Sequence, residues 1–156
     1  MNYIITGLPV EQFQPLFGLS DDVLAQRHIV RMTAETPDSY PCRVLLADAQ
    51  PGDTLLLLNY EYQPAETPYR ARHAIFVNEA ATAPRRFENE MPRILTQRKA
   101  ISLRAFDAAD MMIDADVVPG AEVENLALKL LENPETAYLH AHFAGRGCFA
   151  ARIDRL

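Results

Sequence analysis

The alternation of apolar and polar positions along this chain predicts mainly β-strands and one clear helix. Residues 121–132 carry apolar side chains at the spacing of an amphipathic helix, and Asn133-Pro134 follows, where proline cannot continue the helical hydrogen bonding. The most apolar run, residues 54–62, predicts a strand in the interior of a sheet. Further strands are expected at residues 42–47, 74–77, 101–106, 137–143 and 148–153.

These elements predict an α+β fold with a single domain over residues 1–156. We expect one antiparallel or mixed sheet, because the strands and helices do not alternate as regular βαβ units. The turn at Pro51-Gly52 predicts that the strands 42–47 and 54–62 pair as a hairpin. A chain of this length can bury roughly two thirds of its unfolded surface in one core, and no repeat or linker interrupts the sequence.

The end of the chain predicts a C-terminal β-hairpin that turns at Gly145-Arg146-Gly147. With a three-residue loop, Phe143 faces Phe149 and Ala141 faces Ala151, which gives one wholly apolar face. The opposite face then carries Tyr138, His140, His142, Cys148 and Arg152. This second face, with two histidines and a thiol, is the first candidate for a functional site.

Composition and charge exclude several classes of protein. The net charge of −6 argues against a nucleic-acid partner, since such proteins usually present a basic surface. No run approaches the roughly 18 apolar residues that span a bilayer, and the first residues lack the features of a signal peptide. We therefore expect a cytoplasmic protein without membrane contact, in which the two cysteines stay reduced. The sequence carries no signal for the oligomeric state.

The cysteines and histidines are the candidate catalytic residues: Cys42, His140, His142 and Cys148. A thiolate beside an arginine, with a histidine as base, could act as a nucleophile. Alternatively, His140, His142 and Cys148 could bind zinc, with water or Cys42 as the fourth ligand. The competing interpretation is that the cysteines are small buried side chains and the histidines are simply hydrogen-bonded or solvated.

Arginine dominates the basic residues, and only Lys99 and Lys129 are lysines. The planar guanidinium group suits the capture of carboxylates or phosphates, which makes a small anionic ligand a candidate partner. The candidate ligand-binding residues are Arg43, Tyr69, Arg70, His73, Arg146 and Arg152. We expect Arg43, His73 and the hairpin face to line one cleft. A solvated arginine surface without any ligand is the alternative.

Several short motifs, in order, resemble a bacterial family known only as domain of unknown function 1203. They are Pro41-Cys42-Arg43, Leu46-Ala47-Asp48-Ala49, Gly52-Asp53, Thr67-Pro68-Tyr69-Arg70, Ile75-Phe76-Val77, His140-Ala141-His142 and Gly147-Cys148-Phe149. The resemblance covers nearly the whole chain and implies a compact domain, but it implies no activity or cofactor.

Three functions therefore remain open from the sequence. The first is a protein that binds a small anionic ligand through an Arg/His face. The second is a thiol- or metal-dependent enzyme that uses the Cys/His cluster. The third is a structural or protein-interaction domain, in which the histidine face is covered by another chain or by the helix at 121–132.

Overall fold

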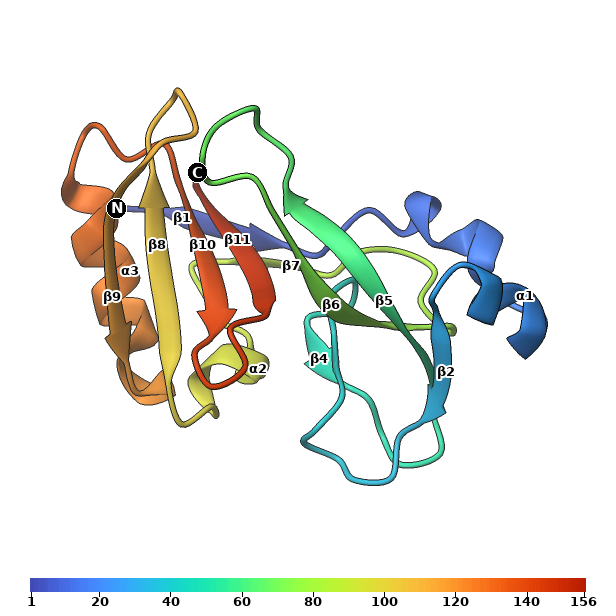
Figure 1. Cartoon of the computed structure of the whole chain (residues 1–156). Coiled ribbons are helices and arrows are strands. Elements are labelled where there is room, and N and C mark those ends of the chain that lie inside the picture. The colour runs from blue at the N-terminus through green and yellow to red at the C-terminus, as the bar shows by residue number, and fades with distance from the viewer.

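The computed structural model describes all residues 1–156 and contains two β-sheets that lie side by side (Figure 1). The larger sheet has six antiparallel strands, and both ends of the chain contribute to its interior. Its order is β7 (Arg86–Glu88), β1 (Tyr3–Thr6), β11 (Phe149–Arg155), β10 (Tyr138–Phe143), β8 (Ile101–Phe106) and β9 (Met112–Val118).

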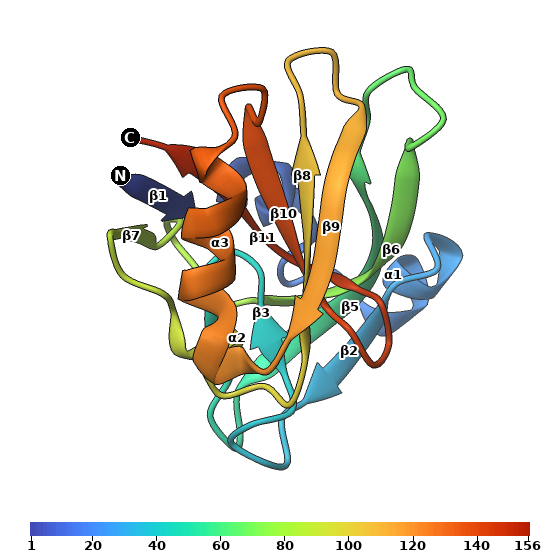
Figure 2. The ribbon, with the colours of Figure 1, turned by 90° about the vertical axis from the view of Figure 1, so that its left-hand side faces the viewer.

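One face of the six-stranded sheet is covered by helix α3 (Val123–Glu132), as Figure 2 shows. The helix buries its apolar stripe against alternate residues of the strands, among them Leu103 and Leu139. The short helix α2 (Arg93–Thr96) and the 3₁₀ turn η3 (Gly120–Glu122) contact each other and close this core at the end where α3 begins. No helix is long and apolar enough to cross a lipid bilayer.

The smaller sheet has five strands and a separate apolar core. Its order is β2 (Val30–Thr33), β5 (Thr54–Gln63), β6 (Ala71–Asn78), β3 (Pro41–Cys42) and β4 (Ala47–Asp48). One face packs on the N-terminal segment, which contains η1 (Val10–Gln12), η2 (Gln14–Leu16) and α1 (Asp21–Gln26). Helix α1 begins after Ser20, whose hydroxyl oxygen accepts a hydrogen bond from the Val23 amide.

The predicted α+β fold, the helix at 121–132 and most strands are confirmed, but the number of sheets is not as expected. The run 54–62 lies inside a sheet, between β2 and β6, as its two apolar faces suggested. The expected pairing of strand 42–47 with strand 54–62 is wrong. Residues 43–46 form a turn that joins the two-residue strands β3 and β4, and β3 pairs with β4 and β6.

The predicted register of the C-terminal hairpin is correct at its base and wrong near its turn. Leu139 pairs with Ile153 and Ala141 with Ala151, as expected, but the register then shifts and His142 pairs with Phe149. This β-bulge turns the Phe149 ring to the opposite face of the sheet, away from α3. The physical reason is that this second face is also buried, because the five-stranded sheet covers it.

Aromatic side chains join the two sheets. Tyr62 of β5 stacks on Phe149 of β11 with ring centroids 5.4 Å apart, and it meets the rings of His140 and His142 edge-on. Farther along the boundary, the Gln63 side-chain amide donates a hydrogen bond of 2.9 Å to the Tyr138 hydroxyl. The histidine face is therefore covered from within the chain, by β5, and not by α3.

Candidate functional site

His140 and His142 project from β10 into the aromatic cluster between the sheets. Their exposed fractions are only 3% and 0%. The His142 Nδ1–H donates to the carbonyl oxygen of Gly147 at 2.9 Å, which leaves the lone pair of Nε2 facing the interior. Neither this atom nor Nδ1 of His140 has a hydrogen-bond partner.

Burial lowers the pKa of both imidazoles, to about 3 for His140 and about 4 for His142. The neighbouring histidine and the cationic Arg152 and Arg104 lower the pKa of His140 further. Both side chains are therefore neutral at physiological pH. They are placed to stabilise the contact between the sheets and are closed off from solvent.

The candidate metal ligands do not come together. No group of three or more His, Cys, Asp or Glu side chains is placed to hold a metal ion, so His140, His142 and Cys148 do not form the zinc site considered from the sequence. Cys42 is fully buried, and its sulfur accepts hydrogen bonds from the amides of Leu45 (3.4 Å) and Asn78 (3.3 Å). Cys42 thus stabilises the turn after β3 and is closed to an external substrate.

The remaining candidates meet in a pocket of about 530 Å³ where the hairpin loop 143–148 faces the five-stranded sheet. This volume lies in the range of small-molecule sites. Its lining is Met32, Asp38, Ser39, Tyr40, Pro41, Arg43, Leu57, His73, Ala74, Phe76, Arg98, Phe143, Arg146 and Cys148. The predicted residues Arg43, His73, Arg146 and Cys148 therefore share one cavity, whereas His140 and His142 lie outside it.

Arg43 is the most unusual residue of this pocket, because its side chain is charged and only 2% exposed. Its Nε donates to the carbonyl oxygen of Phe149 at 2.8 Å and its Nη1 to that of Pro41 at 2.5 Å, while its guanidinium lies over the Phe143 ring. Nη2 donates to no oxygen atom of the protein, the Cys148 side chain interacts with the guanidinium, and Arg43 takes part in no ion pair with a carboxylate within 4.0 Å. The pocket thus contains a buried cation without a carboxylate counter-ion.

Cys148 lies next to this cation at the end of the hairpin loop. Burial lowers the pKa of the Arg43 guanidinium, and the adjacent Cys148 side chain partly offsets that effect. The Cys148 side chain is half-buried, and no hydrogen bond joins its sulfur to either histidine. His73 of β6 is also half-buried at the pocket, with its Nδ1 3.2 Å from the carbonyl oxygen of Ala74.

Two further arginines line the pocket in different states of pairing. Arg98 holds the carboxylate of Asp48 with two hydrogen bonds of 2.7 and 3.0 Å, and its guanidinium also lies over Phe143. Arg146 is exposed at the tip of the hairpin and has no ion-pair partner. Arg98 is one of seven arginines from Arg70 to Arg104, and nothing in the sequence distinguished it from the others.

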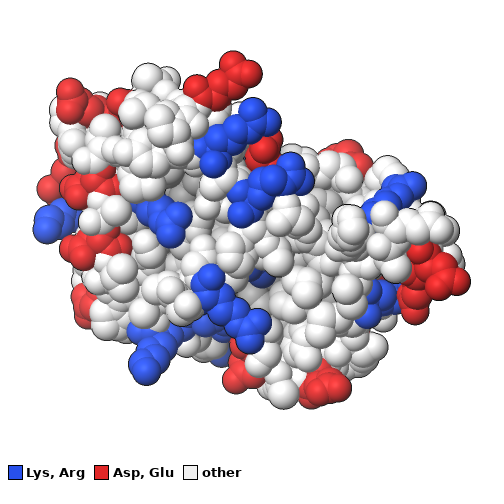
Figure 3. Space-filling model, viewed as in Figure 1, with Lys and Arg blue, Asp and Glu red and all other residues white.

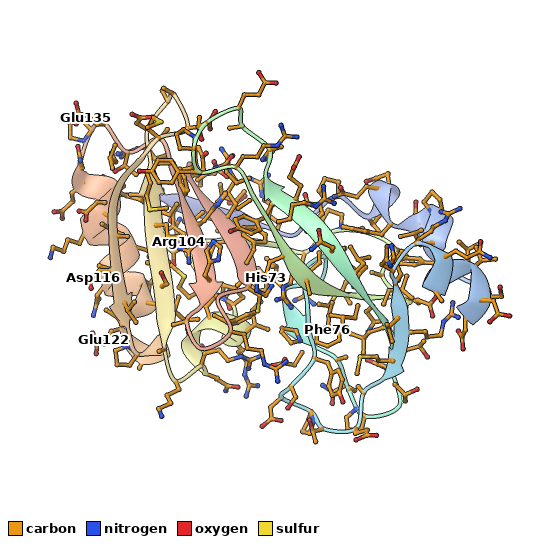
Figure 4. All side chains as sticks on the ribbon, viewed as in Figure 1. His73, Phe76, Arg104, Asp116, Glu122 and Glu135 are labelled. Carbon is orange, nitrogen blue, oxygen red and sulfur yellow. The ribbon has the colours of Figure 1, made fainter.

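The other predicted ligand-binding residues do not line this pocket. Arg70 pairs with Glu61, the Tyr69 ring packs edge-on against Phe106, and Arg152 covers the Tyr138 ring and pairs with Asp154. Basic side chains nevertheless gather along the middle of this face, where the two sheets meet (Figure 3). Figure 4 places His73 and Arg104 on opposite sides of this boundary. Arg104 lies opposite His140 on β8.

A second pocket of about 490 Å³ contains none of the predicted site residues. Its lining combines the guanidinium groups of Arg85 and Arg93 with the carboxylates of Asp48 and Glu90. Arg85 and Arg93 are exposed, so this pocket lacks the buried cation that distinguishes the first.

Comparison with protein families gives one match, over residues 39–155, to the family described as protein of unknown function, DUF1203. The chain belongs to this family. The resemblance seen in the sequence motifs is thus confirmed. The matched region includes every lining residue of the pocket of about 530 Å³, from here on called the Arg43 pocket, except Met32 and Asp38. No curated protein and no solved structure matches the chain.

Proposed function

We propose that this DUF1203 protein binds a small organic anion in the pocket lined by Arg43, His73, Arg146 and Cys148. The observation that supports the proposal best is the buried guanidinium of Arg43. A charged group that is removed from water without a counter-ion is costly to the folded state, and an anion bound next to Nη2 would offset that cost. Arg146 at the pocket mouth would attract the same anion.

A pair of alkylating reagents tests this proposal directly, because Cys148 is a natural reporter on the pocket wall. Iodoacetate and iodoacetamide carry the same reactive carbon, but only iodoacetate has a carboxylate. We expect the ratio of their rates at Cys148, measured by mass spectrometry, to exceed the ratio for glutathione by about tenfold. This corresponds to the ~1.5 kcal/mol or more of a hydrogen bond to a charged group.

The matched variants are Arg146→Gln and Arg152→Gln, which each remove one exposed arginine from the same hairpin. Only Arg146 lines the pocket. Arg146→Gln should lower the iodoacetate preference roughly two- to fivefold, as for an exposed charge worth about 0.2–1 kcal/mol, while Arg152→Gln should leave it unchanged. A rate ratio at Cys148 equal to that of glutathione would contradict anion binding.

The position of Cys148 also supports a second candidate function, thiol chemistry on a bound substrate. Its sulfur lines the pocket next to the Arg43 cation, so a substrate anion held at Arg43 would lie beside the thiol. A nucleophilic Cys148 should react with neutral iodoacetamide well below pH ~8.5, the pKa of an ordinary thiol. A pH profile like that of glutathione would leave ligand binding as the function and remove the enzyme alternative.

A further inference from the structure

The walls of the Arg43 pocket differ in chemistry, and the difference indicates what kind of anion would fit. The hairpin loop and the turn after β3 contribute polar groups, namely the guanidinium groups of Arg43 and Arg146 and the thiol of Cys148. The five-stranded sheet contributes Met32, Leu57 and Phe76. A ligand that fills the pocket therefore meets charge on one side and an apolar surface on the other.

The apolar wall follows from strand register. Leu57 of β5 lies between Val30 of β2 and Phe76 of β6, so these three side chains form a row across one face of the sheet. Met32 points to the same face, because it is two residues from Val30. The Tyr40 ring packs on Phe76 at a centroid distance of 5.4 Å. The row ends at Val30, which is 54% exposed.

Phe76 also packs, with Tyr40, against a small core of Ala34, Ala49 and Leu55 on this face, but the row extends beyond that core. Leu57 and Phe76 remain half-buried, whereas Leu56 and Val77, which point to the opposite face of the same strands, are fully buried. Apolar surface that stays accessible next to a pocket is typical of a place where a ligand is bound. The aromatic pair of Tyr40 and Phe76 would suit a flat ring.

The charge balance of the pocket favours a single negative charge on the ligand. Arg98 is neutralised by Asp48, which leaves Arg43 and Arg146 as the cations without a carboxylate. Asp38 is the one acidic side chain of the lining. Two cations against one carboxylate leave one unbalanced positive charge, which matches a carboxylate better than a doubly charged phosphate.

We infer that the ligand is an amphipathic monocarboxylate, such as an aromatic or medium-chain aliphatic acid, with its carboxylate at Arg43 and its apolar part along Met32, Leu57 and Phe76. This inference rests on the proposed function and specifies its ligand class. The apolar part supplies affinity through burial, and the single charge fixes the orientation.

A competition series tests the inference on the intact protein. Acetate, butyrate, phenylacetate and inorganic phosphate are each added while iodoacetamide reacts with Cys148, and the concentration that halves the rate is measured. Each buried methylene group should improve protection about fourfold, so phenylacetate should protect at a concentration at least about tenfold lower than acetate. Phosphate should protect less well than phenylacetate.

Two methionine variants show whether the apolar wall is responsible. Met32→Gln keeps the length of the side chain but makes the wall polar, and it should remove most of the advantage of phenylacetate over acetate. Met112→Gln makes the same change in a half-buried methionine of β9, outside the pocket, and should have no effect.

The possible outcomes separate this inference from the proposed function. Equal protection by acetate and phenylacetate, stronger protection by phosphate, or an unchanged phenylacetate advantage in Met32→Gln would overturn the ligand class, while the preference for iodoacetate would still support an anion pocket. Absence of protection by every anion, together with no preference for iodoacetate, would overturn both.

Discussion

At the scale of single residues, His140 and His142 stay unprotonated between the two sheets. In the unfolded chain both take up protons below their ordinary pKa of ~6.5, whereas in the folded protein they do so only near pH 3 to 4. The unfolded state therefore gains protons first as the pH falls. The contribution of the two histidines to the free energy of unfolding should be fully present above pH ~6.5. Below that pH it should decrease by up to about 1.4 kcal/mol per pH unit for each histidine.

Urea unfolding between pH 7.5 and 4.5 measures this slope. His140→Leu should roughly halve the loss of stability over that range, because one of the two titrating imidazoles is removed. His28→Asn is the control, since His28 is exposed and its positive φ of 58° suits asparagine. A pH dependence that is the same in wild type and His140→Leu would contradict this account.

Residue types identified the pocket only in part. Sequence reasoning selected Arg43, His73, Arg146 and Cys148, because guanidinium, imidazole and thiol groups recognise anions or act as nucleophiles. It could not separate them from His140 and Cys42, because burial decides which of these groups a ligand reaches. The burial depends on β5 crossing the histidine face, a contact between residues far apart in the sequence.

At the scale of elements, the pattern of apolar residues predicted the strands well but failed at residues 43–46, whose apolar side chains enter two different cores. Val44 packs into the core of the five-stranded sheet and Leu46 into that of the six-stranded sheet. Their apolar run therefore looks like a strand, although residues 43–46 turn and Leu46 adopts a left-handed φ of 50°. No local pattern distinguishes a turn between two cores from a buried strand.

Gly7 packs closely against the backbone of the turn at residues 43–46. A Cβ added to Gly7 would lie 1.9 Å from the carbonyl oxygen of Val44, and the Gly7 amide is fixed by a hydrogen bond to the Arg85 carbonyl. Gly7→Ala should therefore destabilise the protein by at least roughly 1–3 kcal/mol in chemical denaturation. Gly145→Ala is the control, with no atom within 4 Å of the added group, and should change stability by less than about 0.5 kcal/mol. Equal effects would rule out the predicted steric clash.

At the scale of the whole molecule, Tyr62 is the main aromatic contact between the sheets. Tyr62→Ala should destabilise the protein by roughly 1–3 kcal/mol and admit water to the histidines, so that the pKa of His142, followed by NMR, rises from about 4 toward its ordinary value. Tyr60→Ala removes a ring from the same strand that packs on Phe13 instead. It should leave the His142 pKa unchanged, and a matching rise in both variants would contradict the assignment.

The division into two sheets is the part of the architecture that was not predicted from the sequence. A single sheet with one apolar and one polar face was expected, and the polar residues of the hairpin supported that picture. Tyr138, His140 and His142 have polar atoms on largely apolar rings, so they can be buried in an aromatic interface. Because these three residues were interpreted as a solvent-exposed polar face, the five-stranded sheet that covers them was not predicted.

The position of β1 has a consequence for the order of folding. Its residues lie between β7 and β11, and the amide of Leu156 donates to the carbonyl oxygen of Asn2, so the two ends of the chain are neighbours (Figure 2). Tyr3 and Ile5 belong to the core that α3 covers. During synthesis the first strand must wait for nearly the last residues before its β11 partner exists. Pairing over such sequence separation is slow, so the six-stranded sheet should close late, after the locally connected strands β5 and β6 have paired.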